Sequence, residues 1–424
     1  MIRGYMKTTS RPALLAAAGL LLGSYAYGPA KAADLGGSCC GDLEERVAEL
    51  EATTARKGNR KVSLQIYGQV NRGLLVWDDG EDSDAYVVDN DAQSTRFGFT
   101  GKAMMKPGWT AGYSIELEVQ DAASDEVSQV SDELGGTADL IRTRLANWYL
   151  ESDRLGRLTL GQASTASDGI TEISLHNNAG KTIGSTALSK SFAVLGVDAV
   201  GVIPAGSARW GDIASNLAGL SRNDIIRYDS PSLYGFILST SWGDNDLWDV
   251  ALRFKKEWNS FRIAAGIGYW EDATGLAIND KEGIGGSISV MHVPTGLFGT
   301  FSIAEQDFEE DIVGRDDASY WALQFGVERK WLPYGATTIY GEYASYEGDF
   351  DGASGVVVAG GSSDDFAGTE ATKWGVSIVQ NFEQAALDIY AHAEFWDSDG
   401  VPPVGTEAGG GELTLFMIGS RIKF

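Results

Sequence analysis

The sequence ends in TLFMIGSRIKF, residues 414–424, and this stretch decides the fold. One parity of the stretch holds Thr414, Phe416, Ile418, Ser420, Ile422 and Phe424, and the other holds Gly419, Arg421 and Lys423. Because side chains alternate between the two faces of a strand, this segment has an apolar row on one side and charged or small residues on the other. A strand of a soluble β-sandwich and a strand of a membrane β-barrel could both show this alternation, so the rest of the chain must decide between the two folds.

The alternation recurs along the chain. Apolar residues at every second position are separated by polar ones in residues 62–71, 111–120 and 387–395. The polar positions include Glu116, Glu118 and Glu394, which are costly on a strand face unless that face is wet. A water-filled lumen explains them. The pattern predicts an all-β protein, a transmembrane antiparallel β-barrel that is apolar outside and polar inside.

Residues 1–32 have the features of a secretory signal. Arg3, Lys7 and Arg11 form a basic start, an apolar stretch covers residues 13–27, and Ala30-Lys31-Ala32 has the form of a cleavage site. The alternative is an N-terminal membrane anchor, but the apolar run is too short to span a bilayer comfortably. We therefore expect an exported protein, located in the outer membrane of a Gram-negative bacterium.

The charge balance excludes several partners. The formal net charge is −26, and removal of residues 1–32, which hold four basic and no acidic side chains, leaves it near −30. Such acidity argues against nucleic acid, whose phosphates need a surplus of Lys and Arg. It favours cations near the protein. The 12 Trp and 16 Tyr are enough for the aromatic girdles of a barrel.

The predicted periplasmic extension, residues 33–60, contains a short helix at 42–56. Leu43, Val47, Leu50 and Thr54 recur at helical spacing among glutamates. The helix is either a two-heptad coiled-coil seam, which needs partner chains, or a solvated spacer. Cys39 and Cys40 have no metal-ligand spacing, and the chain predicts no metal and no cofactor.

The barrel domain is predicted over residues 61–424, with about sixteen strands. They are expected near 62–77, 92–105, 109–120, 139–151, 156–162, 222–229, 234–242, 247–257, 261–271, 283–293, 297–306, 318–330, 335–346, 371–381, 385–396 and 412–424. Short connections with turn residues alternate with long acidic ones at 78–91, 121–138, 307–317, 347–370 and 397–411. We expect the short turns to face the periplasm and the long loops to face outward.

One connection is unusually long. Residues 163–221 show no clear period of two, and a structureless stretch of that size is uncommon unless it is functional. One interpretation is a loop that folds into the barrel and narrows the lumen. The alternatives are a surface insertion or two unrecognised strands.

Several motifs resemble the Gram-negative general-diffusion porin family. The most specific is SRNDIIRYDSP, residues 221–231, directly after the long connection. Thr95–Phe99, Thr143–Ala146 and Leu158–Gln162 are similar to the family's second, fourth and fifth strands, and the family also ends in Phe, here Phe424. The helix at 42–56 resembles an N-terminal extension found in some porin subfamilies.

The resemblance implies a homotrimer of sixteen-stranded barrels with a constriction between a basic wall and an acidic loop. The wall would hold Arg96, Arg142, Arg144 and Arg222, and the loop would offer Asp168, Glu172, Asp198 and Asp212. Parity supports most of the wall. Phe97 and Phe99 face lipid, which places Arg96 in the lumen, and a lipid-facing Ile141 and Leu145 do the same for Arg142 and Arg144. The parity of Arg222 is ambiguous.

The leading function is a pore for passive diffusion of small hydrophilic solutes and ions. A substrate-selective channel for sugars or organic acids, and a structural anchor of the envelope, remain alternatives. An enzyme is disfavoured because the three histidines, His176, His292 and His392, have no nucleophile motif beside them. Expected partners are outer-membrane lipids, lipopolysaccharide and the barrel insertion machinery, for which Phe424 is the expected assembly signal.

Overall fold

The computed structural model describes residues 62–119, 121–132, 141–194, 208–244, 246–273, 281–308, 317–348, 369–399 and 411–424. The predicted signal (1–32) and the extension (33–60) lie outside the described residues. Among those described, no helix is long and apolar enough to cross a membrane.

Strands make up most of the regular structure. They are β1 (Gln65–Asp78), β2 (Ser83–Asp89), β3 (Arg96–Lys106), β4 (Trp109–Val119), β5 (Ile141–Ser152), β6 (Gly156–Ser164), β7 (Arg222–Asp229), β8 (Phe236–Gly243), β9 (Trp248–Trp258), β10 (Phe261–Asp272), β11 (Lys281–His292), β12 (Leu297–Phe308), β13 (Ala318–Leu332), β14 (Gly335–Glu347), β15 (Glu370–Phe382), β16 (Leu387–Asp399) and β17 (Glu412–Lys423). The described helices are short: two 3-10 turns, Asp91–Gln93 and Glu383–Ala385, and α3 (Trp210–Ile213).

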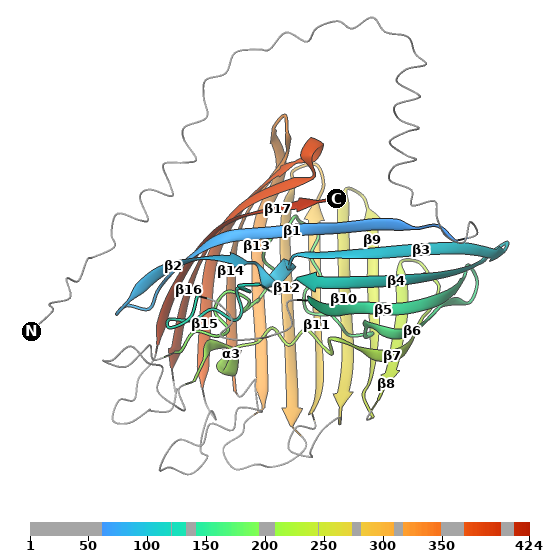
Figure 1. The fold of residues 1–424 in the computed structure, drawn as a ribbon, viewed down its shortest axis with the longest axis horizontal. Coiled ribbons are helices and arrows are strands. Elements are labelled where there is room, and N and C mark those ends of the chain that lie inside the picture. The colour runs from blue at the N-terminus through green and yellow to red at the C-terminus, as the bar shows by residue number, and fades with distance from the viewer. Residues whose placement is uncertain are drawn as a thin grey trace, which may run out of the picture. The chain divides into compact units, whose positions relative to one another are not determined.

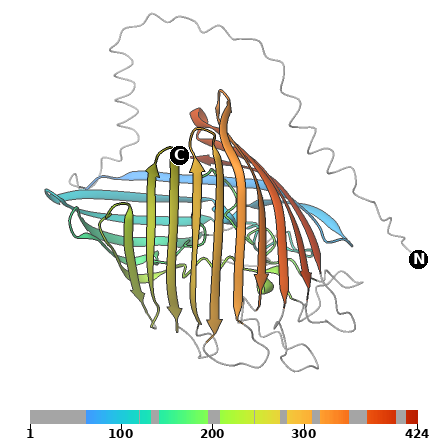
Figure 2. The same ribbon diagram turned by 180° about the vertical axis from the view of Figure 1, so that it is seen from behind.

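The strands close into one antiparallel barrel (Figures 1 and 2). Each strand from β3 to β17 pairs with the next in the chain, and β17 pairs with β1. The other edge of β1 pairs with β3 through Gln65–Gln69 and with β2 through Arg72–Asp78. Because β2 and β3 share one position beside β1, the 17 strands fill sixteen positions, as predicted. Closure pairs every sheet edge, which a bilayer requires.

One predicted loop contains a strand. Residues 78–91 were expected to be a long connection, but Ser83–Asp89 forms β2, a hairpin partner of β1. Tyr86 and Val88 are buried on one face of this short strand, but the acidic residues Asp82 and Asp84 beside them made the sequence look like a loop. That expectation was therefore wrong for this half of the loop.

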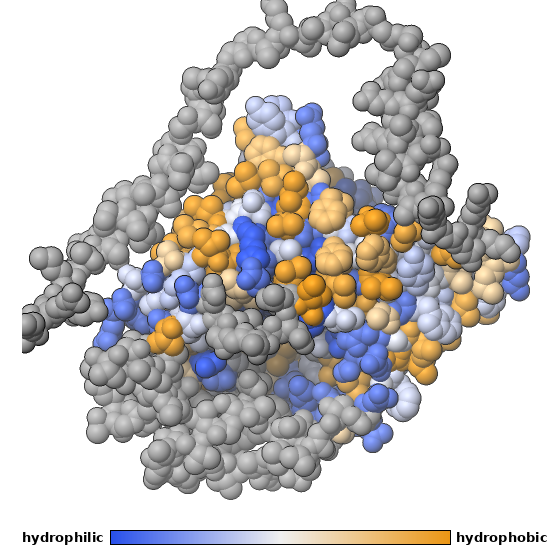
Figure 3. Space-filling view, in the orientation of Figure 1, coloured by the Kyte–Doolittle hydropathy of each residue, from blue (hydrophilic) through white to orange (hydrophobic). Residues whose placement is uncertain are grey.

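The two faces of the strands separate as predicted. In β13, Trp321, Leu323 and Phe325 are exposed on the outside of the barrel, and the alternating Tyr320, Ala322 and Gln324 are buried inside. The same alternation runs through β16 and β17. Figure 3 shows hydrophobic side chains gathered on the outer face around β1 and its neighbours.

Residues 165–221, which we call the lumen segment, connect β6 to β7 and run inside the barrel. Hydrogen bonds join the segment to the inner wall in succession: Ser167 to Asp249 of β9, Ile173 to Ser287 of β11, Asn177 to Glu328 of β13, and Gly184 to Tyr346 of β14. In Figure 1 its trace passes between the front and rear strands. For the described parts, the predicted inward fold is therefore confirmed, and neither a surface insertion nor two extra strands is present.

The lumen segment carries the hydrophobic core of the molecule. Its buried Phe192 packs on Trp77 of β1, with ring centroids 5.6 Å apart, and Trp210 packs on Trp396 of β16 at 5.4 Å. Burial of such aromatic side chains is the largest favourable contribution to this contact. This core also corrects one expectation. The inner face of the last strand, β17, was expected to carry charged or small residues, but it is charged only near its end. Leu415 and Met417, on the inner face of β17, are apolar because they join this core.

Candidate channel constriction

Three arginines of the predicted basic wall lie on β3 and β5, on either side of Glu116 and Glu118 of β4, and the fourth, Arg222, begins β7. Arg144 Nε lies 2.9 Å from Glu116 Oε1, and its Nη1 lies 2.9 Å from Glu118 Oε1. Arg142 Nη2 lies 2.8 Å from Glu118 Oε2, and Arg96 Nε lies 3.7 Å from Glu116 Oε1. The first carboxylate partners of the arginines are therefore wall glutamates of β4. Three guanidinium groups share these two carboxylates, and Arg142 also interacts electrostatically with Asp91 and Asp125.

A β-bulge explains the direction of Arg144. The register of β4 with β5 passes from Glu116↔Leu145 to Leu117↔Thr143, which leaves Arg144 as the extra residue. A bulge shifts the alternation by one position. Leu145 was expected to face lipid, but it lines a polar recess of the inner wall together with Asn147. The lumen-facing prediction for Arg144 is correct, although the argument from Leu145 was wrong.

Among the predicted loop carboxylates, Glu172 interacts electrostatically with Arg222, one of the predicted wall arginines. Its Oε1 accepts hydrogen bonds from Asn216 Nδ2 at 2.7 Å and Thr182 Oγ1 at 3.1 Å. Burial raises the pKa of Glu172 above its ordinary value, and the nearby Asp168 adds to this, whereas the two hydrogen bonds and Arg222 oppose it. Arg222 also interacts electrostatically with Arg96. Arg222 therefore interacts electrostatically both with Arg96 of the predicted wall and with Glu172 of the lumen segment.

The other predicted carboxylates have different surroundings. Asp168 is half-buried, and its backbone carbonyl accepts a hydrogen bond from Arg253 Nη2 at 2.9 Å. Asp212 is buried in α3, where its carboxylate accepts a hydrogen bond from the Arg209 N–H at 2.7 Å and so caps the helix. Asp198 lies outside the described residues. The charge interaction with a wall arginine that the structure shows is that of Glu172 with Arg222.

A clamp at the start of the lumen segment was not predicted. Arg253 of β9 donates to the carbonyl oxygens of Ala166 and Asp168, and Asp249 of the same strand accepts from Ser167 N and Oγ, both at 2.6 Å. Both side chains have lumen parity in the sequence, which is the signal that could have found them. They fix the point at which the segment leaves the wall, directly beside Asp168.

The comparisons with known proteins agree with this architecture. The family model described as Gram-negative porin matches residues 18–400, most of the chain. The chain belongs to the Gram-negative porin family. It is an outer-membrane porin that forms a passive diffusion channel.

Solved structures share the fold of this porin. The anion-selective porin from Comamonas acidovorans aligns with a TM-score of 0.54 at 16% identity, covering 86% of this chain and 100% of that one. The trimer form of OmpT from Vibrio cholerae gives 0.51 at 14%, covering 86% and 99%. The outer-membrane channel DcaP of Acinetobacter baumannii gives 0.51 at 13%, covering 88% and 100%. The search of curated proteins finds no match.

A second unpredicted cluster holds the middle of the lumen segment in this porin. Lys181 Nζ lies 2.9 Å from Glu394 Oε1 of β16 and 3.3 Å from Glu342 Oε1 of β14, and Lys373 Nζ of β15 lies 2.9 Å from the same Glu342 oxygen. Burial alone would lower the pKa of Lys181, but the carboxylates of Glu342 and Glu394 outweigh it and raise that pKa. We call Lys181, Glu342, Lys373 and Glu394 the buried charge anchor. All four side chains are almost fully buried, so the anchor belongs to the contact between the lumen segment and the wall and not to the open channel.

Proposed function

We propose that Arg96, Arg142, Arg144 and Arg222 on one side, and Glu172 on the other, form the constriction and create a transverse electric field across it. The support is the position of Arg222, which interacts electrostatically with both Arg96 and Glu172. The field orients dipolar solutes and water. Apolar solutes must displace that ordered water, so small hydrophilic solutes and ions pass most readily.

The local charges also predict how the constriction contributes to selectivity. The wall arginines are only partly neutralised by Glu116 and Glu118, so this side attracts anions. Glu172 is the opposing negative charge. A raised pKa makes Glu172 easier to protonate than an exposed glutamate, so its contribution declines in mild acid.

Charge removal on opposite sides tests the proposal. The double variant Arg96→Gln/Arg144→Gln should raise the cation-to-anion permeability ratio, and Glu172→Gln should lower it, as measured by reversal potentials in planar bilayers. Arg262→Gln is a matched control, because Arg262 pairs with Glu257 at 2.8 Å in an exposed contact beside the Asn259–Ser260 turn. Shifts of the same sign from both sides would contradict a transverse field.

We also propose that the porin is a homotrimer surrounded by outer-membrane lipids and lipopolysaccharide, and that the insertion machinery assembles it. The trimer form of the similar OmpT supports this proposal. Gel migration with and without heating tests it, since an assembled trimer should collapse to monomer only on boiling. A preferred solute should block the ion current in a saturable manner. Such a block by a sugar or an organic acid would distinguish a selective channel from a general pore.

A further inference from the structure

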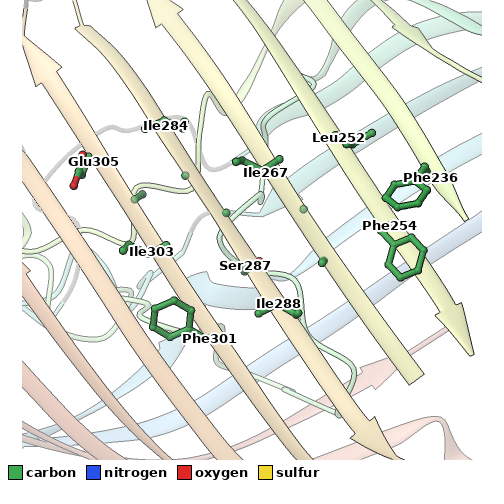
Figure 4. A pocket seen from close by; sticks show the side chains of 15 residues that line it. Phe236, Leu252, Phe254, Ile267, Ile284, Ser287, Ile288, Phe301, Ile303 and Glu305 are labelled. Atoms are coloured by element: carbon green, nitrogen blue, oxygen red, sulfur yellow. The ribbon is translucent and has the colours of Figure 1, made fainter. Parts of the chain in front are cut away.

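An apolar groove crosses the outer face of the wall from β8 to β12. Its volume is about 520 Å³, within the ~300–1,000 Å³ typical of ligand sites. In cross-strand register, one row of the groove contains Phe254, Ala265, Ile288 and Phe301, and the next contains Leu252, Ile267, Gly286 and Ile303. Ala265 and Gly286 are the small members of these rows and form its floor. The larger side chains stand up as walls (Figure 4).

The two ends of the groove differ in charge. Glu305 lines one end, and Glu282 and Asp307 lie on the same outer face nearby, where they face each other in register. At the other end, Lys256 is two residues beyond Phe254 on the same face of β9, roughly 7 Å further toward the short turn at Asn259–Ser260. Lys256 is exposed, and the neighbouring Glu257 pairs with Arg262 instead.

We propose that this groove binds one acyl chain of an anionic phospholipid, with the lipid phosphate on Lys256. The face is in contact with the bilayer because the protein is an outer-membrane barrel, so hydrocarbon chains are its solvent. Apart from Ser287 and Glu305, the residues that line the groove have no polar side chain for a hydrophilic ligand. The charges fix the orientation of the lipid: a phosphate is attracted by Lys256 and repelled by Glu305 and its neighbours.

The choice of a lipid over a second copy of the chain follows from the same charges. A protein partner would have to bring a narrow apolar ridge together with groups complementary to a single lysine and three carboxylates. A lipid needs only one acyl chain to fill the apolar groove and one phosphate to pair with the lysine. The lipid site depends on the protein being an outer-membrane porin and not on the proposed constriction. Either proposal can therefore fail without the other.

Native mass spectrometry of the detergent-solubilised porin tests the proposal with two probes of identical chains, phosphatidylglycerol and phosphatidylcholine. We expect one phosphatidylglycerol to be retained per barrel and phosphatidylcholine to be retained less. Ala265→Phe fills the floor of the groove with a ring, and the backbone need not change because Ala265 already has a Cβ. This variant should abolish retention of the lipid. Lys256→Gln should weaken phosphatidylglycerol binding about fivefold, as expected for one lysine beside an anionic headgroup. It should weaken phosphatidylcholine binding by less, because the choline group of that lipid already balances its phosphate.

Matched controls separate the groove from general lipid contact. Ala391→Phe adds the same side chain on the outer face of β16, and Lys255→Gln removes the charge next to Lys256 on the opposite, lumen-facing side of β9. Both should retain lipid as the unmodified porin does. Equal loss from Ala265→Phe and Ala391→Phe, or equal retention of the two lipids, would overturn the proposal. So would loss of the oligomer without loss of lipid in Ala265→Phe, which would assign the groove to a second copy.

Discussion

At the scale of the residue, Phe424 completes the closure of the barrel. Its N–H donates to the Gly68 carbonyl oxygen, and its own carbonyl accepts from the Gly68 N–H, both at 3.0 Å. Gly68 has no side chain because the Phe424 ring covers it: an added Cβ would lie 2.5 Å from that ring. The aromatic ring and the glycine therefore form one contact on the outer face of the first and last strands.

Deletion of Phe424 should lower the yield of folded barrels in the outer membrane. It removes two hydrogen bonds, each contributing about 1 kcal/mol, and uncovers Gly68. Channels that do form should keep normal conductance, because the residue lies on the outer face. Phe424→Tyr should restore assembly. Unchanged recovery of folded protein after the deletion, measured by heat-dependent gel mobility, would show that closure does not need this residue.

His176 gives the lumen segment a dependence on pH. Its ring stacks on Phe298, with centroids 4.1 Å apart, and neither ring nitrogen has a hydrogen-bond partner among the described residues. Burial lowers the pKa of His176 from 6.5 to about 4, although Glu342 opposes the shift. A lowered pKa means that the free segment binds a proton before the docked one does. The docked state is therefore fully stable above pH 6.5 and loses stability as the pH falls from 6.5 toward 4.

We expect acidification through this range to increase closing events and current noise in single-channel recordings. His176→Phe keeps a ring stacked on Phe298 and cannot titrate, so it should remove the part of the response between pH 6.5 and 4. His292→Phe, on the outer face of β11, is the control and should respond as the unmodified porin does. An unaltered pH response in His176→Phe would assign the effect to other groups.

At the scale of the element, the lumen segment depends on its buried charges. Lys181→Met should loosen the segment, because it leaves two buried carboxylates short of a partner at a cost of about 3–5 kcal/mol. Conductance should become noisier or larger in bilayer recordings. Lys190→Met is the control in the same segment: Lys190 is half-exposed and its pair with Asp125, at 3.4 Å, contributes about 0–1 kcal/mol.

A partly compensating variant makes this prediction stricter. Lys181→Met/Glu394→Gln removes one charge of each sign, so less uncompensated charge stays buried than in Lys181→Met. The glutamine side chain introduced at position 394 can still accept the hydrogen bond from Trp396 Nε1 through its amide oxygen. Recordings quieter than those of Lys181→Met are expected. Equal noise from Lys181→Met and Lys190→Met would show that the anchor does not hold the segment.

The strands were predictable from the sequence, and the path of the lumen segment was not. Alternation of lipid-facing and inward residues located every position of the barrel, because one face of each strand must be apolar. It failed where the backbone departs from regular pairing, at the bulge of Arg144 and at β2. The contacts of the segment join residues such as Lys181 and Glu342, which are far apart in the chain. No local period indicates such a pair, so the cluster of Lys181, Glu342, Lys373 and Glu394 was missed. Glu172 was one of four candidates that came from the resemblance alone.

At the scale of the whole molecule, two sources of charge act over different distances. The acidity of the chain, −26 overall, is concentrated in stretches such as 121–138, 347–370 and 397–411, which we expect from the sequence to face outward. The proposed constriction instead has a local excess of arginine. Acidic connections at a channel mouth gather cations, and their reach is the Debye length, about 30 Å in 0.01 M salt and about 3 Å in 1 M salt. The arginines act at contact distance and are screened much less.

The ion preference of this porin should therefore change with salt. In 0.01–0.1 M KCl we expect a preference for cations, because the unscreened acidity of the mouth dominates. Toward 1 M the preference should decline, and what remains should reflect the arginines and Glu172. Reversal potentials at a fixed salt ratio and rising mean concentration measure this. Arg96→Gln/Arg144→Gln should keep a cation preference to higher salt than the unmodified channel. A preference that is constant from 0.01 to 1 M would mean that a single site inside the lumen decides which ions pass, with no contribution from the acidic connections.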